Sequence, residues 1–359
     1  RSAGELITEA FERIVPGATR MDLDAWLRAR PNLRHKGRPL ADWAIGEALA
    51  SVLSPAGHRF VNDAFGYDSG LRGQNAADAI PYLLGAGDPS GEARTPDAGM
   101  QAIPVALAAA FVNRGGGVRF EHQLQDIEAD EGGAQRLLFT NGNSVAARRV
   151  VLALPAPPLR RLARRVRQLG DGRVLAMLDS VDAWDAAKLY LWFDLPWWRD
   201  DGFLGMRITT DLPARKIFAF DEQGVEGPSI LLGAYTDGRD VEPWASLDDG
   251  STPGTVATPA MVDALYQYLG AVFPSNTGIP PPVGTAFKHW GADPLECGWH
   301  YWRPGVDSVQ LIADIVQPNP GHELYICGEA FSRWQAWVEG ALESASTVVD
   351  RLTALDNRR

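Results

Sequence analysis

The residues with the clearest chemical pattern lie near the C-terminus, in the stretch ICGEAFSRWQAWVEGALESA. A short apolar run, typical of a strand, ends there at Gly328 and Glu329. A loop rich in aromatic residues follows, and a helix is predicted to begin near Trp337. The start of a helix presents unpaired backbone N–H groups and a partial positive charge. The pattern therefore predicts a site for an anion or an electron-rich carbonyl at this junction.

Two further residues could take part in redox or proton chemistry. Lys188 lies at the edge of the apolar run AAKLYLWFDL, and His300 lies in the aromatic segment CGWHYW. A histidine exchanges protons near physiological pH, because its unperturbed pKa is about 6.5. Each candidate also has a structural interpretation. Lys188 could be an exposed surface residue, His300 a buried and hydrogen-bonded one, Trp337 a core residue, and Glu329 a cap for the next turn.

The composition excludes several classes of protein. The 359 residues are 45% hydrophobic, which is enough for a large core and for two domains. A net charge of -11 and a pI of about 5.1 argue against nucleic acid as a partner, because phosphate contacts need clustered Lys and Arg. The longest apolar run, 100–112, is shorter than the roughly 20 residues that a membrane span needs.

Cysteine usage bears on metal binding and on location. Cys297 and Cys327 are the only cysteines, and no Cys/His cluster has the spacing of a zinc site, so no metal is predicted. Two reduced thiols favour the cytoplasm. No apolar segment of the signal type follows Arg1. We therefore expect a cytoplasmic protein, with secretion after processing as the alternative.

Periodicity predicts the elements that position these residues. Helices are predicted over 4–14, 40–53, 100–111 and 257–273, and strands over 117–130, 134–155, 186–195, 215–222 and 229–236. TNGNS, within 134–155, supplies a hairpin turn. The segment 84–99 is rich in Gly, Pro and Asp and predicts a long loop or a crossing between domains. This order favours an α/β (α+β) fold with two domains interleaved in sequence.

These segments, in this order, resemble the flavin-containing amine oxidase family, which includes monoamine, polyamine and L-amino acid oxidases. Gly328 and Glu329 match the family's Gly-Glu pair, and residues 337–341 match its aromatic-x-Glu-Gly-Ala helix start. TPDAGMQAIPVALAAAF is similar to its Gly-Gly-Met segment, with Ala98 in place of the first Gly. KLYLWFDLPWW resembles its Lys-strand-Pro-x-Trp segment, and HWGADPLECGWHYWRPG its Trp-x-x-Asp-Pro segment.

The resemblance implies a fold and a set of site residues. The chain would form the C-terminal part of a two-domain FAD-dependent oxidase, with 1–94 and 158–306 in the substrate domain and 95–157 and 307–359 in the FAD-binding domain. The implied FAD-binding residues are Leu124, Gly328, Glu329, Trp337, Val338, Ala341 and Trp299. The implied catalytic residues are Lys188, Trp337 and His300, and the implied substrate pocket is formed by His300, Trp299 and Trp337.

Individual roles follow from the same resemblance. Leu124 is placed where the backbone meets the adenine end of FAD, and Glu329 points toward the ribityl-pyrophosphate. The Val338 N–H points toward a flavin carbonyl. Lys188 matches the lysine that holds a water at flavin N5, where its charge would favour electron transfer to oxygen. The faces of Trp337 and His300 would flank the amine and favour the growing cation by about 0.5–2 kcal/mol.

Two departures from the family modify these expectations. Members begin with a strand, a Gly-x-Gly-x-x-Gly turn and a helix that bind the pyrophosphate, and neither GLRGQNAADA nor NRGGGVRF fits that pattern. We predict that a second polypeptide, made from a separate gene or by proteolysis, carries this segment. A segment upstream of Arg1 in a longer chain would explain the same absence. Cys297 lies two residues before the position expected for a flavin linkage, so non-covalent FAD is predicted.

The predicted reaction oxidises an amine or L-amino acid to the imine, which yields an oxo product and ammonia, while O2 becomes H2O2. An L-amino acid oxidase with a bulky or aromatic substrate is favoured, because the matched pocket positions hold Trp299 and His300 rather than paired tyrosines. The alternatives are a flavin desaturase or monooxygenase on the same fold, and a non-catalytic subunit that scaffolds a partner.

Overall fold

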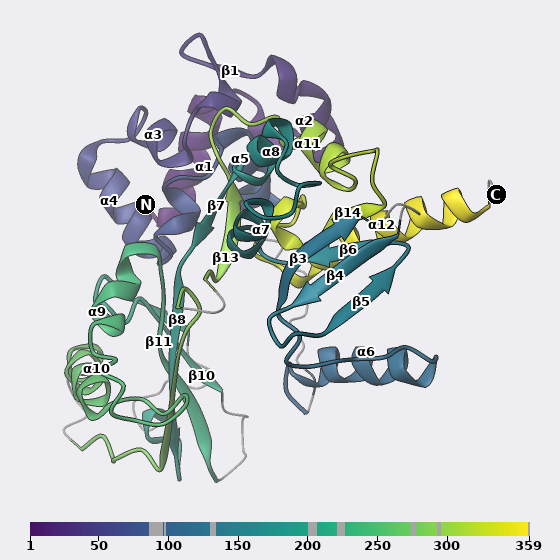
Figure 1. Ribbon diagram of the computed structural model, residues 1–359. Coiled ribbons are helices and arrows are strands. Elements are labelled where there is room, and N and C mark those ends of the chain that lie inside the picture. The colour runs from purple at the N-terminus through teal and green to yellow at the C-terminus, as the bar shows by residue number, and fades with distance from the viewer. Residues whose placement is uncertain are drawn as a thin grey trace.

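The computed structural model describes residues 1–85, 96, 98–129, 134–199, 207–220, 227–273, 278–292 and 296–357. Helices and strands are mixed along the chain, which confirms the predicted α/β class. Figure 1 shows a helical body formed by the first residues, a long sheet beneath it, and smaller sheets beside the C-terminal helix. Most of the predicted loop 84–99, and Asp293 and Pro294 of the Trp-x-x-Asp-Pro segment, lie outside the described residues.

The helical body consists of five helices around one apolar core: α1 (Ala3–Ile14), α2 (Leu23–Ala29), α3 (Ile45–Ala50), α4 (Pro55–Phe65) and α5 (Ala76–Gly85). Ser2 and Glu5 form a capping box that fixes the start of α1. The helix predicted over 40–53 is wrong in its first half, where Leu40–Asp42 is a 3-10 turn. The break arises because Ala44 forms a β-bridge with Asn75, which holds that backbone extended.

The long sheet is antiparallel and has the strand order β12-β8-β11-β10-β9. Its strands are β8 (Ala186–Phe193), β9 (Arg207–Thr209), β10 (Lys216–Phe220), β11 (Ser229–Asp237) and β12 (Gly284–His289). Alternate residues of β8, including Leu189 and Leu191, are buried in a core shared with α10 (Pro259–Val272), and α9 (Glu242–Ala245) lies beside it. Lys188 therefore lies on the face that points away from α10.

The remaining strands surround the strand-to-helix junction, where the site is predicted. The hairpin at TNGNS is confirmed: β3 (Leu124–Ala129), β4 (Gln135–Phe139) and β5 (Ser144–Ala147) form an antiparallel sheet. The strand predicted over 117–130 begins only at Leu124. β6 (Val150–Ala153) pairs in parallel with β14 (Leu324–Cys327), which joins segments distant in sequence. β7 (Val181–Trp184) pairs with β13 (Trp299–Trp302). The domain boundaries stay a prediction.

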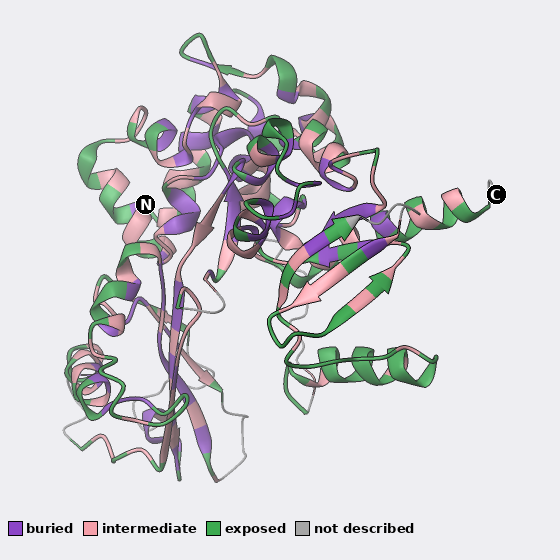
Figure 2. Cartoon of the chain, viewed as in Figure 1, coloured by how far each residue is buried: buried purple, intermediate pink, exposed green. Residues whose placement is uncertain are grey.

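Helices cover these smaller sheets unequally. α7 (Ala156–Ala163), α8 (Gly172–Leu178) and α11 (Ser308–Ile315) share a core with β6 and β14, and α12 (Val338–Asp356) packs on the other face of β14. By contrast, α6 (Ala102–Asn113) contains no buried residue and stands apart below β5 (Figures 1 and 2). Across the described ranges, no helix combines the length and the apolar character that crossing a membrane requires.

Candidate active site

The strand-to-helix junction begins at the end of β14. Gly328 has a φ of +134°, a backbone conformation that is strained for any residue with a Cβ. Its N–H donates to Ser344 Oγ at 2.8 Å, and the Ser344 hydroxyl donates in turn to the carbonyls of Gly328 and Ala341. Ser344 therefore ties two predicted flavin-binding residues to each other.

The helix after the junction begins as predicted, with Trp337 as its N-cap and Val338 as its first residue. No side chain of the described residues caps this end, so the first N–H groups of α12 can bind an external acceptor. At Gly340, a Cβ would overlap Ser332 Oγ and the carbonyl of Trp334. A glycine is therefore required where the helix touches the aromatic loop.

The structure gives Glu329 and His300 a shared contact that the sequence did not indicate. Nδ1 of His300 lies 2.5 Å from Oε1 of Glu329, and Oε2 of Glu329 accepts the Ala336 N–H at 2.9 Å. Nε2 of His300 accepts the Ala156 N–H at 3.1 Å, which places the ring proton on Nδ1. The His300 side chain is only 1% exposed. Both ring nitrogens are thus occupied by protein groups, which fits the structural interpretation of His300, and its place in the substrate pocket stays a prediction.

The same geometry modifies the role of Glu329. Both carboxylate oxygens hold protein groups, so the side chain fixes the loop that leads to Trp337. Its contact with FAD stays a prediction. Beside this pair, Cys297 Sγ lies 3.6 Å from His300 Nε2, and burial followed by the charge of Glu329 raises the pKa of its thiol to about 12. Cys297 and Cys327 are both buried.

Lys188 lies in an aromatic environment on the open face of the long sheet. Its Nζ is 4.5 Å from the ring centroid of Tyr235 and 5.5 Å from that of Trp290. No salt bridge to Lys188 occurs among the described residues. Burial lowers the pKa of its amino group. Tyr235 lies directly opposite Lys188 in the register of β11 and β8, and burial, then Asp237, raises its pKa to about 12.

Further aromatic side chains extend this environment toward the helical body. Trp299 packs edge to face against Tyr67 and Tyr235, at centroid distances of 6.3 and 6.4 Å. Tyr67 contacts Tyr235 in the same way at 5.2 Å. A second ammonium group, Nζ of Lys216, lies 4.4 Å above the Tyr67 ring. We call Lys188, Tyr235, Trp290, Trp299 and Tyr67 the lysine cluster.

A buried carboxylate joins the lysine cluster to the helical body. Asp237, at the end of β11, accepts the N–H groups of Asp68 and Ser69 at 2.7 and 2.9 Å, and also the Ser69 hydroxyl. Ser69 Oγ accepts the indole N–H of Trp299 at 3.1 Å. Burial raises the pKa of Asp237 to about 6, and its hydrogen bonds oppose that shift.

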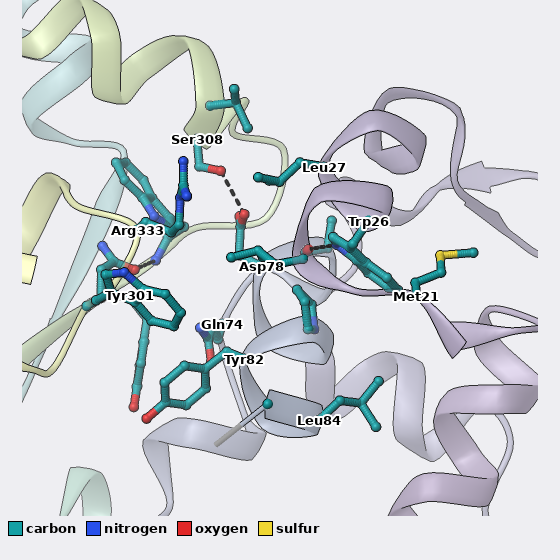
Figure 3. Close-up of a pocket in the computed structure, with 18 of the residues that line it drawn as sticks. Met21, Trp26, Leu27, Gln74, Asp78, Tyr82, Leu84, Tyr301, Ser308 and Arg333 are labelled. Carbon is teal, nitrogen blue, oxygen red and sulfur yellow. Dashed lines mark hydrogen bonds between the residues drawn. The ribbon is translucent and has the colours of Figure 1, made fainter. Parts of the chain in front are cut away.

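A cavity of about 710 Å³ lies between the helical body and the aromatic loop. Most of its lining is apolar or aromatic, and Figure 3 shows Tyr82 and Tyr301 facing Trp26, Leu27 and Met21 across it. Trp334, Trp302 and Trp337 also contribute to the wall. Trp337 is 56% exposed and donates its indole N–H to Tyr82 Oη at 2.6 Å. The volume is in the range of small-molecule sites, roughly 300–1,000 Å³.

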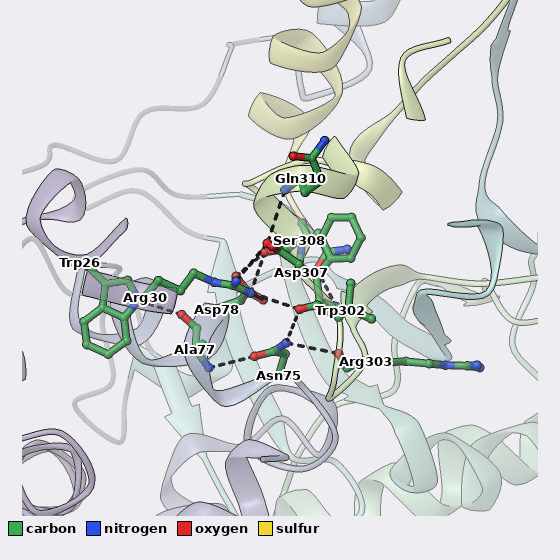
Figure 4. A network of polar contacts seen from close by, with 12 residues as sticks. Trp26, Arg30, Asn75, Ala77, Asp78, Trp302, Arg303, Asp307, Ser308 and Gln310 are labelled. Atoms are coloured by element: carbon green, nitrogen blue, oxygen red, sulfur yellow. Dashed lines mark hydrogen bonds and ion pairs between the residues drawn. The ribbon is translucent and has the colours of Figure 1, made fainter. Parts of the chain in front are cut away.

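A polar network anchors one wall of this cavity (Figure 4). Arg30 lies 3.1 Å from Asp78 Oδ2 and donates to Ser308 Oγ at 3.0 Å, while the Ser308 hydroxyl donates to Asp78 Oδ1 at 2.7 Å. Burial raises the pKa of Asp78, and Arg30 opposes the shift. Since α2, α5 and α11 meet here, the network fixes the spacing of three helices around the cavity.

The structure thus brings the predicted residues into three groups. Lys188 and Trp299 belong to the lysine cluster, Trp337 lines the cavity, and Gly328, Glu329, Val338 and Ala341 form the junction. Leu124 lies apart, where it begins β3 and packs on the core beneath β6. Among the described residues, no group of three or more His, Cys, Asp or Glu could hold a metal ion.

Three tyrosines of the site, Tyr67, Tyr82 and Tyr235, were not predicted from the sequence. The signal for Tyr235 was its place in the strand run SILLGAYT, but its position opposite Lys188 depends on the register of two distant strands. Nothing in the sequence indicates Tyr67 or Tyr82, because each reaches the site only through the packing of the helical body.

Several known proteins align with most of this chain. The chain is 29% identical to aplysianin-A of Aplysia kurodai over 346 residues, which cover 87% of this chain and 62% of that protein. It is 24% identical to achacin of Lissachatina fulica, with 97% and 67% covered. It is 26% identical to the flavin-dependent L-tryptophan oxidase RebO of Lentzea aerocolonigenes, with 70% and 52% covered. The chain thus spans about two thirds or less of the length of these relatives.

A family model also matches most of the chain. Residues 41–353 match the family described as flavin containing amine oxidoreductase. That range includes the lysine cluster, the junction and most of the residues that line the cavity, and it confirms the resemblance stated from the sequence. This protein is a member of the flavin-containing amine oxidoreductase family.

Proposed function

We propose that this chain forms the substrate-facing part of an FAD-dependent oxidase of L-amino acids with bulky or aromatic side chains. The observation that carries the proposal is Lys188, whose ammonium group lies on aromatic faces without a carboxylate in the described part of the chain. A half-buried cation without an ion-pair partner is costly for a purely structural purpose. It suits a site where negative charge develops during reaction.

The residues of the junction fit one end of the flavin. The uncapped first turn of α12 offers the Val338 N–H. Gly328 has no Cβ, so it leaves space for a ligand that another residue at this position would fill. When bound, FAD would accept a hydride equivalent from the carbon beside the amine and pass electrons to O2. Lys188 would hold its proton beside the site of oxygen reduction, and its charge would favour electron transfer to O2.

The cavity supports the choice of substrate. Its aromatic and aliphatic lining would exclude water around an apolar side chain, and its volume exceeds what a small aliphatic group fills. Trp337, at the wall of the cavity, would place its ring beside the amine. One relative is named as an L-tryptophan oxidase, which is consistent with a bulky substrate.

The form of the cofactor and its remaining contacts are part of the proposal. We propose that FAD is non-covalent, because both cysteines are buried and the pKa of the Cys297 thiol is far above neutral pH. The pyrophosphate needs a Gly-rich turn that these 359 residues do not contain. We propose that a second polypeptide supplies it; intact-mass measurement of the purified protein distinguishes this from a longer single chain.

An anaerobic titration tests the function. The natively purified protein, with all of its subunits, is titrated with L-tryptophan, L-phenylalanine, L-alanine and benzylamine while the flavin absorbance is recorded. Bleaching by the two aromatic amino acids, followed by ammonia and peroxide in equal amounts after admission of air, is expected. Bleaching with little ammonia or peroxide would instead indicate a desaturase or monooxygenase. A native protein without a flavin spectrum would indicate a scaffolding subunit and would sink the proposal.

A further inference from the structure

Two buried glutamines in the wall of the cavity differ in their hydrogen bonds. Gln74 and Gln335 are each 4% exposed. Gln335 Oε1 accepts the Trp302 N–H at 2.8 Å, and its Nε2 donates to the Ala330 carbonyl at 2.6 Å. Gln74 Oε1, by contrast, is buried with no hydrogen-bond partner in the described part of the chain. Because nearly all buried polar atoms of folded proteins are hydrogen-bonded, this oxygen calls for a partner from outside the chain.

Backbone hydrogen bonds fix the position of Gln74, so its side chain stays at the cavity. The Gln74 carbonyl accepts the Ile45 N–H at 2.8 Å. The next residue, Asn75, donates its N–H to the Trp302 carbonyl at 2.8 Å and takes part in a β-bridge. Gln74 thus lies just before α5, in the cavity wall (Figure 3). The last side-chain bond of a glutamine has a broad rotational preference, so the amide can turn Oε1 toward the cavity.

Two other polar side chains of the wall already have protein partners. The carboxylate oxygens of Asp78 are both bound, one by Arg30 and one by Ser308. Both polar atoms of Gln335 are bound as well. Much of the remaining wall consists of aromatic rings, against which a flat ring can pack. An N–H or O–H group on such a ring would find a free acceptor at Gln74.

We propose that Gln74 sets the specificity of this site: its amide oxygen accepts a hydrogen bond from an N–H or O–H group on the aromatic ring of the substrate. An indole and a phenol each carry such a group. The inference rests on the proposed function, because it narrows the bulky or aromatic amino acids to those with a donor on the ring. A ring without a donor leaves the buried oxygen unpaired in the complex, so the site rejects it.

A pair of substrates that differ only in the donor tests this role. L-Tryptophan and 3-benzothienyl-L-alanine have rings of nearly the same shape, but sulfur replaces the indole N–H in the second. In the natively purified protein, the second-order rate constant of anaerobic flavin reduction should be at least about tenfold higher for L-tryptophan. Gln74→Met should bring the two constants together. Gln168→Leu, at a 5% exposed glutamine outside the cavity lining, should keep the wild-type ratio. Equal constants in the wild type, or a ratio unchanged by Gln74→Met, would overturn the proposal.

Equilibrium binding separates this inference from the proposed function. 3-Methylindole and 3-methylbenzothiophene represent the two side chains, and their binding does not require that the protein oxidise an amine. NMR titration should show at least about tenfold tighter binding of 3-methylindole, and Gln74→Met should abolish the preference. This preference, found in a protein whose flavin no amine reduces, would refute the function and support the role of Gln74. Flavin reduction by aromatic amino acids without a preference in either pair would do the reverse.

Thermal unfolding distinguishes recognition from a merely structural role. Gln74→Met removes an unpaired buried atom, so the Tm of the protein without substrate should stay the same or rise. Gln335→Leu removes the partners of the Trp302 N–H and the Ala330 carbonyl, so the Tm should fall. A clear fall of the Tm in Gln74→Met would show that its amide stabilises the fold and would overturn the proposal.

Discussion

The long antiparallel sheet and the parallel strand pair differ in how completely their apolar faces are covered. In the long sheet, β8 and β11 bury their inner residues against α10, and their other face holds the lysine cluster. In the parallel pair, β6 has an exposed outer face, and α6 is apolar but has no buried residue. The first region can hold its chemistry within this chain. The second leaves apolar side chains exposed.

Truncation of one leucine in each region should give the largest contrast in stability. Leu191, fully buried in β8, lies in the core with α10, while Leu107 of α6 is 57% exposed. Leu191→Ala should lower the free energy of unfolding by about 2–5 kcal/mol, since it leaves a cavity. Leu107→Ala should change it by less than about 0.5 kcal/mol, as is usual for exposed positions. Urea unfolding of the chain alone measures both, and equal losses would erase the contrast between the two regions.

Removal of the half-buried Lys188 ammonium tests whether the long sheet carries the oxygen chemistry. Lys188→Met keeps the length of the side chain but removes its charge, and flavin reoxidation should slow by about 10²–10³-fold. Rapid mixing of the reduced holoprotein with oxygenated buffer measures this rate. Lys36→Met, at an exposed position in the helical body, is the control. If Lys188→Met folds normally and its reduced flavin reacts with oxygen at an unchanged rate, Lys188 has no role in flavin reoxidation.

The contact between Glu329 and His300 lies where the two regions meet. Glu329→Ala leaves the His300 Nδ1–H and the Ala336 N–H without their acceptor, so the free energy of unfolding should fall by about 1–3 kcal/mol. Asp350→Ala, an exposed change on α12, should have little effect. Thermal unfolding compares the variants. A loss of FAD from Glu329→Ala with no loss of stability would instead favour the direct ligand contact predicted from the sequence.

The smallest expected effect is a dependence of stability on pH in the covered region. Burial raises the pKa of Asp237 from its usual 3.8 to about 6, so the folded protein holds this proton at a pH where the unfolded chain has lost it. Its contribution to stability should therefore decline as the pH rises from about 4 to about 6. Asp237→Asn should flatten that slope, and Asp248→Asn, at an exposed position, should not. An identical slope in the wild type and Asp237→Asn would contradict the assignment.

Local patterns predicted more of the fold than of the site. The hairpin at TNGNS and the helix beginning at Val338 follow from residues that are close in sequence, and both are found. The break before α3 depends on a bridge to Asn75, which no local pattern encodes. The approach of Tyr235 to Lys188 depends on the pairing of β11 with β8, and the His300–Glu329 contact depends on the packing of β13 against the turn after β14. Residue types identified the chemistry, but the partners of each residue required the tertiary structure.

Both ring nitrogens of His300 form hydrogen bonds, which restricts the substitutions that this part of the protein can accept. An acid at position 329 needs the Nδ1–H of His300, and the same ring accepts the N–H of Ala156 at the start of α7. A change at either position alone therefore leaves a buried polar group in a neighbouring element without its hydrogen-bond partner. Positions 300 and 329 should behave as one inherited unit, and a protein engineer who transplants the junction into another scaffold will have to move the histidine with it.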